Sequence, residues 1–181
     1  MTQITRRYNP IIIGLHWFML ALLIAVYFTM EIHGYLPKGS AERKFVTSLH
    51  FMLGMSVLLL VVIRLAVRVS SSTPAIEPAP KPIENLLAKV MHVTLYVFMI
   101  AMPIAGWLVF SAEGNSVPFF GLEIPPIMGK DHALGEKIED LHKLGGTIGY
   151  FLIALHALAG LFHHYVKKDN TLLRMSFRKN G

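Results

Sequence analysis

Residues 142 to 164 read HKLGGTIGYFLIALHALAGLFHH, an apolar stretch that contains four histidines. In an α-helix, residues fourteen positions apart point within about 40° of one another and lie about 21 Å apart along the axis. His142 and His156 therefore project from one face of the expected helix at two depths. His163, seven positions further on, returns to the same face near the end of the stretch.

Glycines accompany these histidines at helical spacing. Gly146 follows His142 by four positions and Gly160 follows His156 by four, so each glycine lies about one turn from an imidazole. A helix with so little side-chain volume beside its histidines leaves room for a wide, flat group or for a closely packed neighbouring helix. The sequence alone leaves both alternatives open.

The composition is that of a membrane protein, because 54% of the 181 residues are hydrophobic and only 15% are charged. Four stretches of at least eighteen residues carry no formal charge, namely 11–30, 46–63, 90–110 and 144–166. Each is long enough to cross about 30 Å of hydrocarbon as a helix. We therefore predict an all-α membrane protein, a bundle of four transmembrane helices that forms one domain over residues 1–181. The expected helices cover about 11–30, 46–68, 86–110 and 135–166.

The chain contains no cysteine, which excludes disulfides, thiolate-bound iron–sulfur clusters and covalently attached c-type haem. Any haem would therefore be held non-covalently. The first apolar stretch is longer than the hydrophobic part of a signal peptide, and no small-residue cleavage site follows it. We expect it to remain in the protein as a membrane span.

Lysine and arginine are unevenly distributed between the two sides of the expected bundle. Eleven lie on the side that holds both termini, and six lie on the other side. This asymmetry predicts that both termini are cytoplasmic. It also accounts for most of the net charge of +6, and no nucleic-acid-binding motif is present.

The remaining spans supply histidines at matching depths. His16 lies near the inner end of the first span, at the level expected for His156, and His50 lies near the outer end of the second, at the level expected for His142. Iron in a bis-histidine haem takes one imidazole from each side, so two pairs at two levels predict two haems between antiparallel helices.

Histidines within a membrane can also serve roles that involve no haem. A single one can be a hydrogen-bonded packing residue or part of the proton relay of a transporter. A zinc or copper site is less favoured, because such a site needs three or four ligands at one level. His92, His163 and His164 lie near the inner interface. For these three residues a packing role is a stronger alternative to a functional role than it is for the paired histidines.

Arg64 follows His50 by fourteen positions and so projects from the same face at the level of the inner haem. A buried guanidinium needs an anionic partner, and a haem propionate would provide one. The alternative is an interfacial arginine whose charged end reaches into water.

Six motifs together resemble the bacterial cytochrome b561 family, and the similarity covers nearly the whole chain. They are GLHW (14–17), SLHFMLG (48–54), PAPKP (78–82), MHVTLY (91–96), DLHKLGGTIGYFLIALHALAGLFHHY (140–165) and KDNTLLRM (168–175). The resemblance implies a four-helix inner-membrane protein with two haems b. It implies that His16 and His156 bind one haem and that His50 and His142 bind the other, in agreement with the depths of these residues.

The family resemblance also implies an activity, that of a superoxide:quinone oxidoreductase of the superoxide oxidase type. Electrons would pass from periplasmic superoxide, or another small donor, to ubiquinone in the membrane. His163, the first residue of the HHY triplet, matches the position that contacts the quinone. The alternative is a passive b-type electron carrier, or a haem-bearing membrane anchor for a partner enzyme.

The expected outer side does not attract anions as a whole, because it carries six basic and eight acidic residues. Only a local patch could steer superoxide toward the protein. This patch consists of Lys38, Arg43 and Lys44, with Lys143 as a further candidate.

Overall fold

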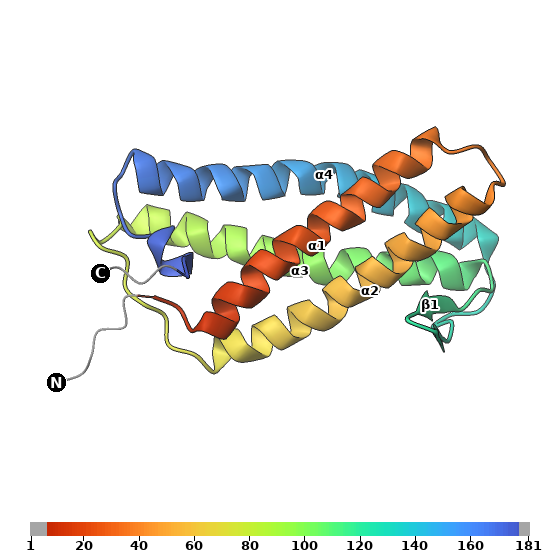
Figure 1. Ribbon diagram of the computed structural model, residues 1–181, viewed down its shortest axis with the longest axis horizontal. Helices are drawn as coiled ribbons and strands as arrows, with labels where there is room; N and C mark the ends of the chain where they lie inside the picture. Colours follow the sequence, from red (N-terminus) through yellow and green to blue (C-terminus); the bar gives the residue numbers. More distant parts are fainter. Residues whose placement is uncertain (1–6, 178–181) are drawn as a thin grey trace.

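The computed structural model describes residues 7 to 177, which form four long helices running along a common axis (Figure 1). In chain order the elements are α1 (Pro10–Tyr35), α2 (Ala41–Val69), α3 (Pro82–Ala112), β1 (Val117–Phe119), β2 (Leu122–Ile124), α4 (His132–Tyr165) and the 3-10 turn η1 (Leu173–Met175). All four helices are long and apolar enough to cross a membrane. The predicted all-α class with four membrane-crossing helices is therefore confirmed, and each helix is longer than the uncharged stretch that predicted it.

Side chains just before the helices cap their free backbone N–H groups. The Asn9 side chain accepts a hydrogen bond from Ile11 N at 2.9 Å at the start of α1. Asp131 accepts one from Leu134 N at 3.0 Å at the start of α4. Pro10 occupies the first position of α1, where its missing N–H costs nothing.

The outward faces of the helices carry large apolar side chains that the protein itself does not cover. Phe28 on α1 is 62% exposed and Phe151 on α4 is 72% exposed. Exposed apolar residues occur along the full length of all four helices. Lipid tails solvate such faces, so the distribution fits a multi-pass membrane protein.

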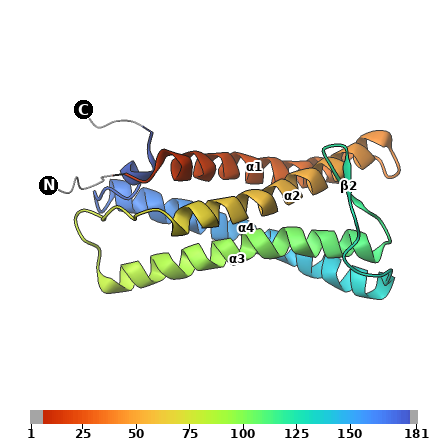
Figure 2. The same cartoon turned by 90° about the horizontal axis from the view of Figure 1, so that it is seen from below.

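The helices pack in a chain of neighbours, with α1 against α2, α2 against α3, and α3 against α4. Met19 and Leu22 of α1 and Val57 and Val61 of α2 form the buried centre of the first contact. By contrast, α4 has no comparable close backbone contact with α1 or α2 within the described residues. The two views in Figures 1 and 2 show α4 running beside α3, with α1 crossing over the bundle. Long side chains must therefore bridge the distance between α4 and the α1–α2 pair.

Glycines bring α4 close to α3. A Cβ atom at Gly145 would lie 2.6 Å from the Met102 sulfur, and one at Gly135 would lie 2.9 Å from the Ala112 Cβ. Both distances are shorter than real Cβ contacts, so the two backbones can approach this closely only because these positions lack side chains.

A short β-hairpin closes the end of the bundle opposite the termini (Figures 1 and 2). Strands β1 and β2 pair antiparallel, and Gly121 in the turn between them has a positive φ of 84°. Val117 is fully buried, and the Trp107 indole N–H donates to the Pro125 carbonyl at 3.1 Å. The all-α prediction did not include this hairpin, which covers the end of α3.

Candidate functional site

The outer histidines of α2 and α4 face each other. The ring centres of His50 and His142 are 6.2 Å apart, and their planes are inclined at 81°. His50 Nδ1 lies 3.1 Å from the Thr29 hydroxyl and 3.3 Å from the Val26 carbonyl, both on α1. Since Thr29 donates its own proton to Val26, it accepts the proton of His50 Nδ1. The Nε2 atom of His50 is then the nitrogen available to a metal.

Two residues of the outer site were not identified from sequence. Thr29 is buried and fixes the His50 ring, and a polar residue within an apolar span was the signal that could have found it. Gly106 on α3 lies next to the His142 ring, where a Cβ atom would be in van der Waals contact with His142 Cε1 at 3.4 Å. No sequence pattern indicates that contact, which depends on the rotation of α3 against α4.

The inner histidines of α1 and α4 also face each other. The ring centres of His16 and His156 are 6.1 Å apart, with an interplanar angle of 70°. His92 of α3 joins this pair, with its ring centre 5.6 Å from that of His156. The sequence indicated only that His92 lies near the inner interface, whereas the structure places it in a cluster of three imidazoles from three helices.

The separation of the rings in both pairs fits two imidazoles that would hold one metal ion between them. A bond from a metal to an imidazole nitrogen is about 2.0–2.1 Å long, so two imidazoles on opposite sides of one ion have ring centres roughly 6.4 Å apart. The separations of 6.2 Å and 6.1 Å in the two predicted pairs are close to this value. The 5.6 Å between His92 and His156 is farther from it.

Space beside the paired rings fits a wide, flat group. Gly54, Gly146 and Gly160 each follow one of the paired histidines by four positions, and a Cβ atom at any of them would meet no described atom within 4 Å. Gly145 and Gly149 are instead in close contact with neighbouring side chains. Open space therefore lies one turn from the rings, and close helix packing lies between them.

An aromatic contact separates the two pairs. Gly149 lies seven residues from each of the two paired histidines of α4, and Tyr27 of α1 and Phe98 of α3 touch it there. The Tyr27 hydroxyl donates to the Gly146 carbonyl at 2.9 Å. This contact is where side chains join α1, α3 and α4 between the outer and inner sites.

Arg64 of α2 lies at the inner site. Its guanidinium is within electrostatic range of His16, His92 and His156, and its Nε atom is 3.4 Å from the Tyr96 hydroxyl. Among the described residues no carboxylate forms an ion pair with Arg64. An anionic group bound at the inner site would therefore find this cation available.

His163, near the C-terminal end of α4, has a direct carboxylate partner. Its Nδ1 atom is 2.5 Å from Oδ2 of Asp169, which is only 5% exposed. Burial raises the pKa of the Asp169 carboxyl, but hydrogen bonds from His163 and Thr171 outweigh burial and hold that pKa below its usual value. The carboxylate is therefore ionised at neutral pH.

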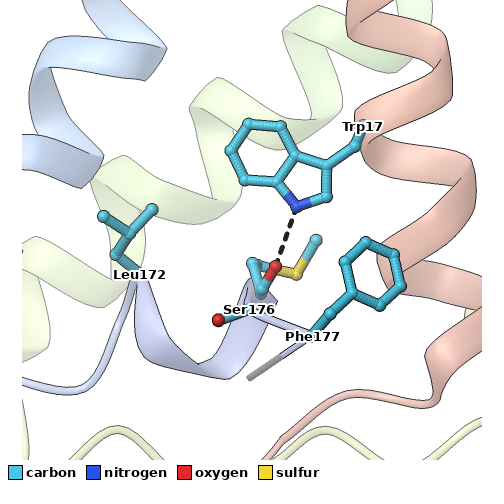
Figure 3. Close-up of a pocket in the computed structure, with 5 residues that line it drawn as sticks. Trp17, Leu172, Ser176 and Phe177 are labelled. Atoms are coloured by element: carbon cyan, nitrogen blue, oxygen red, sulfur yellow. Dashed lines mark hydrogen bonds between the residues drawn. The ribbon is translucent and has the colours of Figure 1, made fainter.

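A shallow apolar pocket lies beside α1 at the same end of the bundle (Figure 3). It has a volume of about 410 Å³ and is lined by Trp17, Leu172, Met175, Ser176 and Phe177. The Trp17 indole N–H donates to the Met175 carbonyl at 2.8 Å, and its ring is 5.2 Å from that of His16. His163 does not line this pocket, so this end of the protein has two distinct candidate regions for an apolar electron acceptor.

The predicted basic patch at the opposite end of the bundle carries less unpaired positive charge than its four basic residues indicate. Lys143 pairs with Glu139 at 2.7 Å, and Arg43 donates to the Leu36 carbonyl at 2.8 Å. Within the described part of the chain, Lys38 and Lys44 form no ion pair. Arg43 keeps its charge, because a carbonyl does not neutralise it, so Lys38, Arg43 and Lys44 remain as the uncompensated cations of the patch.

The fold and the site together define a class of protein. Four membrane-crossing helices with facing imidazoles in the bundle interior characterise the membrane-bound b-type cytochromes, which carry electrons through non-covalent haem. The lack of cysteine fits the same class, since c-type attachment is impossible.

Comparison with known proteins identifies the family. Residues 7–178 match the family described as prokaryotic cytochrome b561. The chain is 37% identical to cytochrome b561 homolog 1 of Escherichia coli over 96% of its own length and 98% of that protein. It is also 37% identical to the probable superoxide oxidase CybB of Yersinia pestis, over 97% and 99% of the two chains. The protein therefore belongs to the prokaryotic cytochrome b561 family of membrane electron carriers, which implies haem b as its cofactor.

Proposed function

We propose that this protein is a di-haem oxidoreductase of the bacterial inner membrane that passes electrons from a small periplasmic donor, superoxide, to ubiquinone. His50 and His142 would hold the outer haem, and His16 and His156 the inner one. Bound haem b supplies reversible one-electron transfer at each position. The single observation that carries this proposal is the pair of facing imidazoles at each of two levels, with ring separations of 6.2 Å and 6.1 Å.

The proposed orientation rests on charge and on the position of the chain ends. The N-terminal and C-terminal ends of the described chain lie at one end of the bundle, together with the linker between α2 and α3 (Figure 1). Among the described residues, that end carries eight lysines and arginines and the opposite end carries six. We assign it to the cytoplasm, which places the hairpin and the outer site toward the periplasm.

The role proposed for Arg64 follows from the lack of a carboxylate partner for it among the described residues. As a cation with no described carboxylate beside it, Arg64 would bind a propionate of the inner haem. A propionate there would neutralise the charge and fix the orientation of the porphyrin.

His163 is the residue proposed to contact ubiquinone. Reduction of a quinone consumes protons as well as electrons, and histidine can deliver protons near neutral pH. His163→Ala should keep both haems and their reduction by superoxide, yet slow reoxidation of the reduced haems by added ubiquinone-1 at least about tenfold. Stopped-flow absorbance of the reduced haem bands measures this rate, with His164→Ala as the matched control on the next residue.

The same measurement separates the proposed enzyme from a passive carrier or anchor. A passive carrier would show no saturable, His163-dependent reaction with ubiquinone. If His163→Ala reoxidises at the wild-type rate, the quinone site lies elsewhere, and His92 and the pocket beside Trp17 are the next positions to test.

Superoxide as the donor is supported by the name of the relative from Yersinia pestis, a probable superoxide oxidase. Xanthine oxidase with its substrate provides a superoxide flux, and added superoxide dismutase provides the control. Haem reduction that dismutase abolishes supports the proposal, and reduction that persists identifies a different donor.

A further inference from the structure

The chain reverses direction directly after α4. Lys168 adopts a positive φ of 56°, which is uncommon for a residue with a side chain, and this turn brings Asp169 back beneath the last helical turn. The Asp169 N–H then donates to the His163 carbonyl at 3.1 Å. The backbone and the side chain of Asp169 thus both bind the same histidine.

Both oxygens of the Asp169 carboxylate accept hydrogen bonds from the protein. Its Oδ2 atom accepts from His163 Nδ1 at 2.5 Å, and its Oδ1 atom accepts from Thr171 N at 2.9 Å. The Asp169 side chain is 3% exposed and the His163 side chain 21% exposed, so water competes little for this bond. With Nδ1 engaged, Nε2 of His163 has no hydrogen-bond partner within residues 7–177.

Other charged groups also surround the pair. Glu84 of α3 lies within electrostatic range of His163, but it forms an ion pair with Lys167. Arg174, which is buried, interacts electrostatically with Asp169 and hydrogen-bonds the Tyr8 hydroxyl at 3.1 Å. Asp169 is therefore the carboxylate in direct contact with the imidazole, and the other acid nearby is already paired.

We propose that Asp169 is the positioning residue for His163: it fixes the imidazole with Nε2 available to a quinone oxygen and stabilises the protonated ring that supplies the proton. This inference rests on the proposed quinone site. Overall, one ubiquinone takes two electrons and two protons to become ubiquinol. The electrons would arrive from the inner haem, one proton passes from Nε2 to the quinone oxygen beside it, and the other quinone oxygen takes its proton from water. The neutral ring then regains its proton at Nε2 from the cytoplasmic side, while the bond between Nδ1 and Asp169 persists.

A purely structural role for Asp169 must be separated from this one. Asp169 could simply anchor the segment that follows α4. The neighbouring Asn170 performs that task without touching His163, because it binds Glu77 N at 2.9 Å and the Ala75 carbonyl at 3.4 Å. Asn170→Ala therefore loosens the same segment while the pair of His163 and Asp169 stays intact.

The test compares Asp169→Asn, Asp169→Glu and Asn170→Ala in the full-length, haem-loaded protein. Reoxidation of the reduced haems by ubiquinone-1 is followed from about pH 5 to about pH 8, where histidine changes its charge. We expect Asp169→Asn to slow reoxidation about tenfold at about pH 8, because the amide replaces the carboxylate that holds the imidazole and its Nδ1 proton. Asp169→Glu should recover part of the rate, and Asn170→Ala should keep the wild-type profile.

The double variant His163→Ala/Asp169→Asn decides whether the two residues act together. If Asp169 acts through His163, the double variant reoxidises as slowly as His163→Ala alone. If His163→Ala is slow but Asp169→Asn keeps the wild-type rate and profile, the positioning role is overturned and the quinone site stands. A wild-type rate for His163→Ala overturns the quinone site itself. Equal profiles for Asp169→Asn and Asn170→Ala would show that Asp169 is an anchor only.

Discussion

The outer and inner imidazole pairs have nearly the same ring separation, 6.2 Å and 6.1 Å, but very different neighbours. At the outer pair, Thr29 and Val26 hold His50, and the Glu139 carboxylate lies within electrostatic range of His142. The inner pair has a third imidazole, His92, and a guanidinium, Arg64, beside it. One bundle thus places similar ligand geometry in two different electrostatic settings.

This difference gives the proposed electron path a direction. A nearby positive charge stabilises the reduced form of a haem, because reduction lowers the charge of the iron. The inner haem beside Arg64 should therefore have the higher potential of the two. Electrons entering at the outer site would then move toward the end of the bundle where His163 lies.

The greatest change should come from removing one ligand at a time. His50→Ala or His142→Ala should lose the outer haem and keep the inner one, and His16→Ala or His156→Ala should do the opposite. Haem content per chain should fall from about two to about one, as measured by the pyridine haemochrome assay.

His92→Ala is the matched control for these ligand variants, since its ring also lies next to His156. It should retain both haems. Loss of the inner haem in His92→Ala, together with its retention in His16→Ala, would assign the inner ligands to His92 and His156 and break the symmetry of the two sites.

A second test uses the glycines beside the rings. Gly146→Leu should displace the outer haem and Gly160→Leu the inner one, because each leucine would fill the space next to one paired histidine. Overfilling a packed site costs about 1–3 kcal/mol, which corresponds to a loss of haem affinity of about fivefold to about 150-fold. Haem retention during gel filtration in detergent measures the loss for each site.

Gly34→Leu serves as the control for the glycine variants, since Gly34 also has no described atom within 4 Å of a Cβ position but lies near the end of α1. It should keep both haems. If all three leucine variants retain haem equally, the space at Gly146 and Gly160 belongs to lipid and not to a porphyrin.

Arg64→Leu should produce the mildest change. Removing the cation should lower the potential of the inner haem by about 60 mV, equivalent to roughly 1.4 kcal/mol for one electron, and should leave the outer potential unchanged. A spectroelectrochemical titration resolves the two haems. Two unchanged potentials would identify Arg64 as an interfacial arginine whose charge reaches water, and Arg64→Lys should restore most of the shift.

The sequence predicted the features that depend on length and helical period. Uncharged stretches long enough to cross the bilayer located the four helices, and the fourteen-residue spacing anticipated that His142 and His156 meet partners at two levels. The hairpin was missed because its strands are three residues each, although the turn residue Gly121 between two apolar stretches was a usable signal.

Contacts that depend on how one helix is rotated against another could not be predicted from the sequence. Helical spacing gave the depth of His92 but not its approach to His156, which requires the packing of α3 against α4. The bond between His163 and Asp169 depends on the left-handed conformation of Lys168, and nothing in a lysine predicts that conformation.

The proposed electron path requires that each of the two facing imidazole pairs binds one haem b. The ratio of haem to protein in the purified wild-type chain, from the pyridine haemochrome assay and quantitative amino-acid analysis, measures this occupancy. We predict about two haems per chain, both low-spin with two axial nitrogen ligands by electron paramagnetic resonance. A ratio of about one, or a high-spin signal from either haem, would contradict the pairing of His50 with His142 and of His16 with His156.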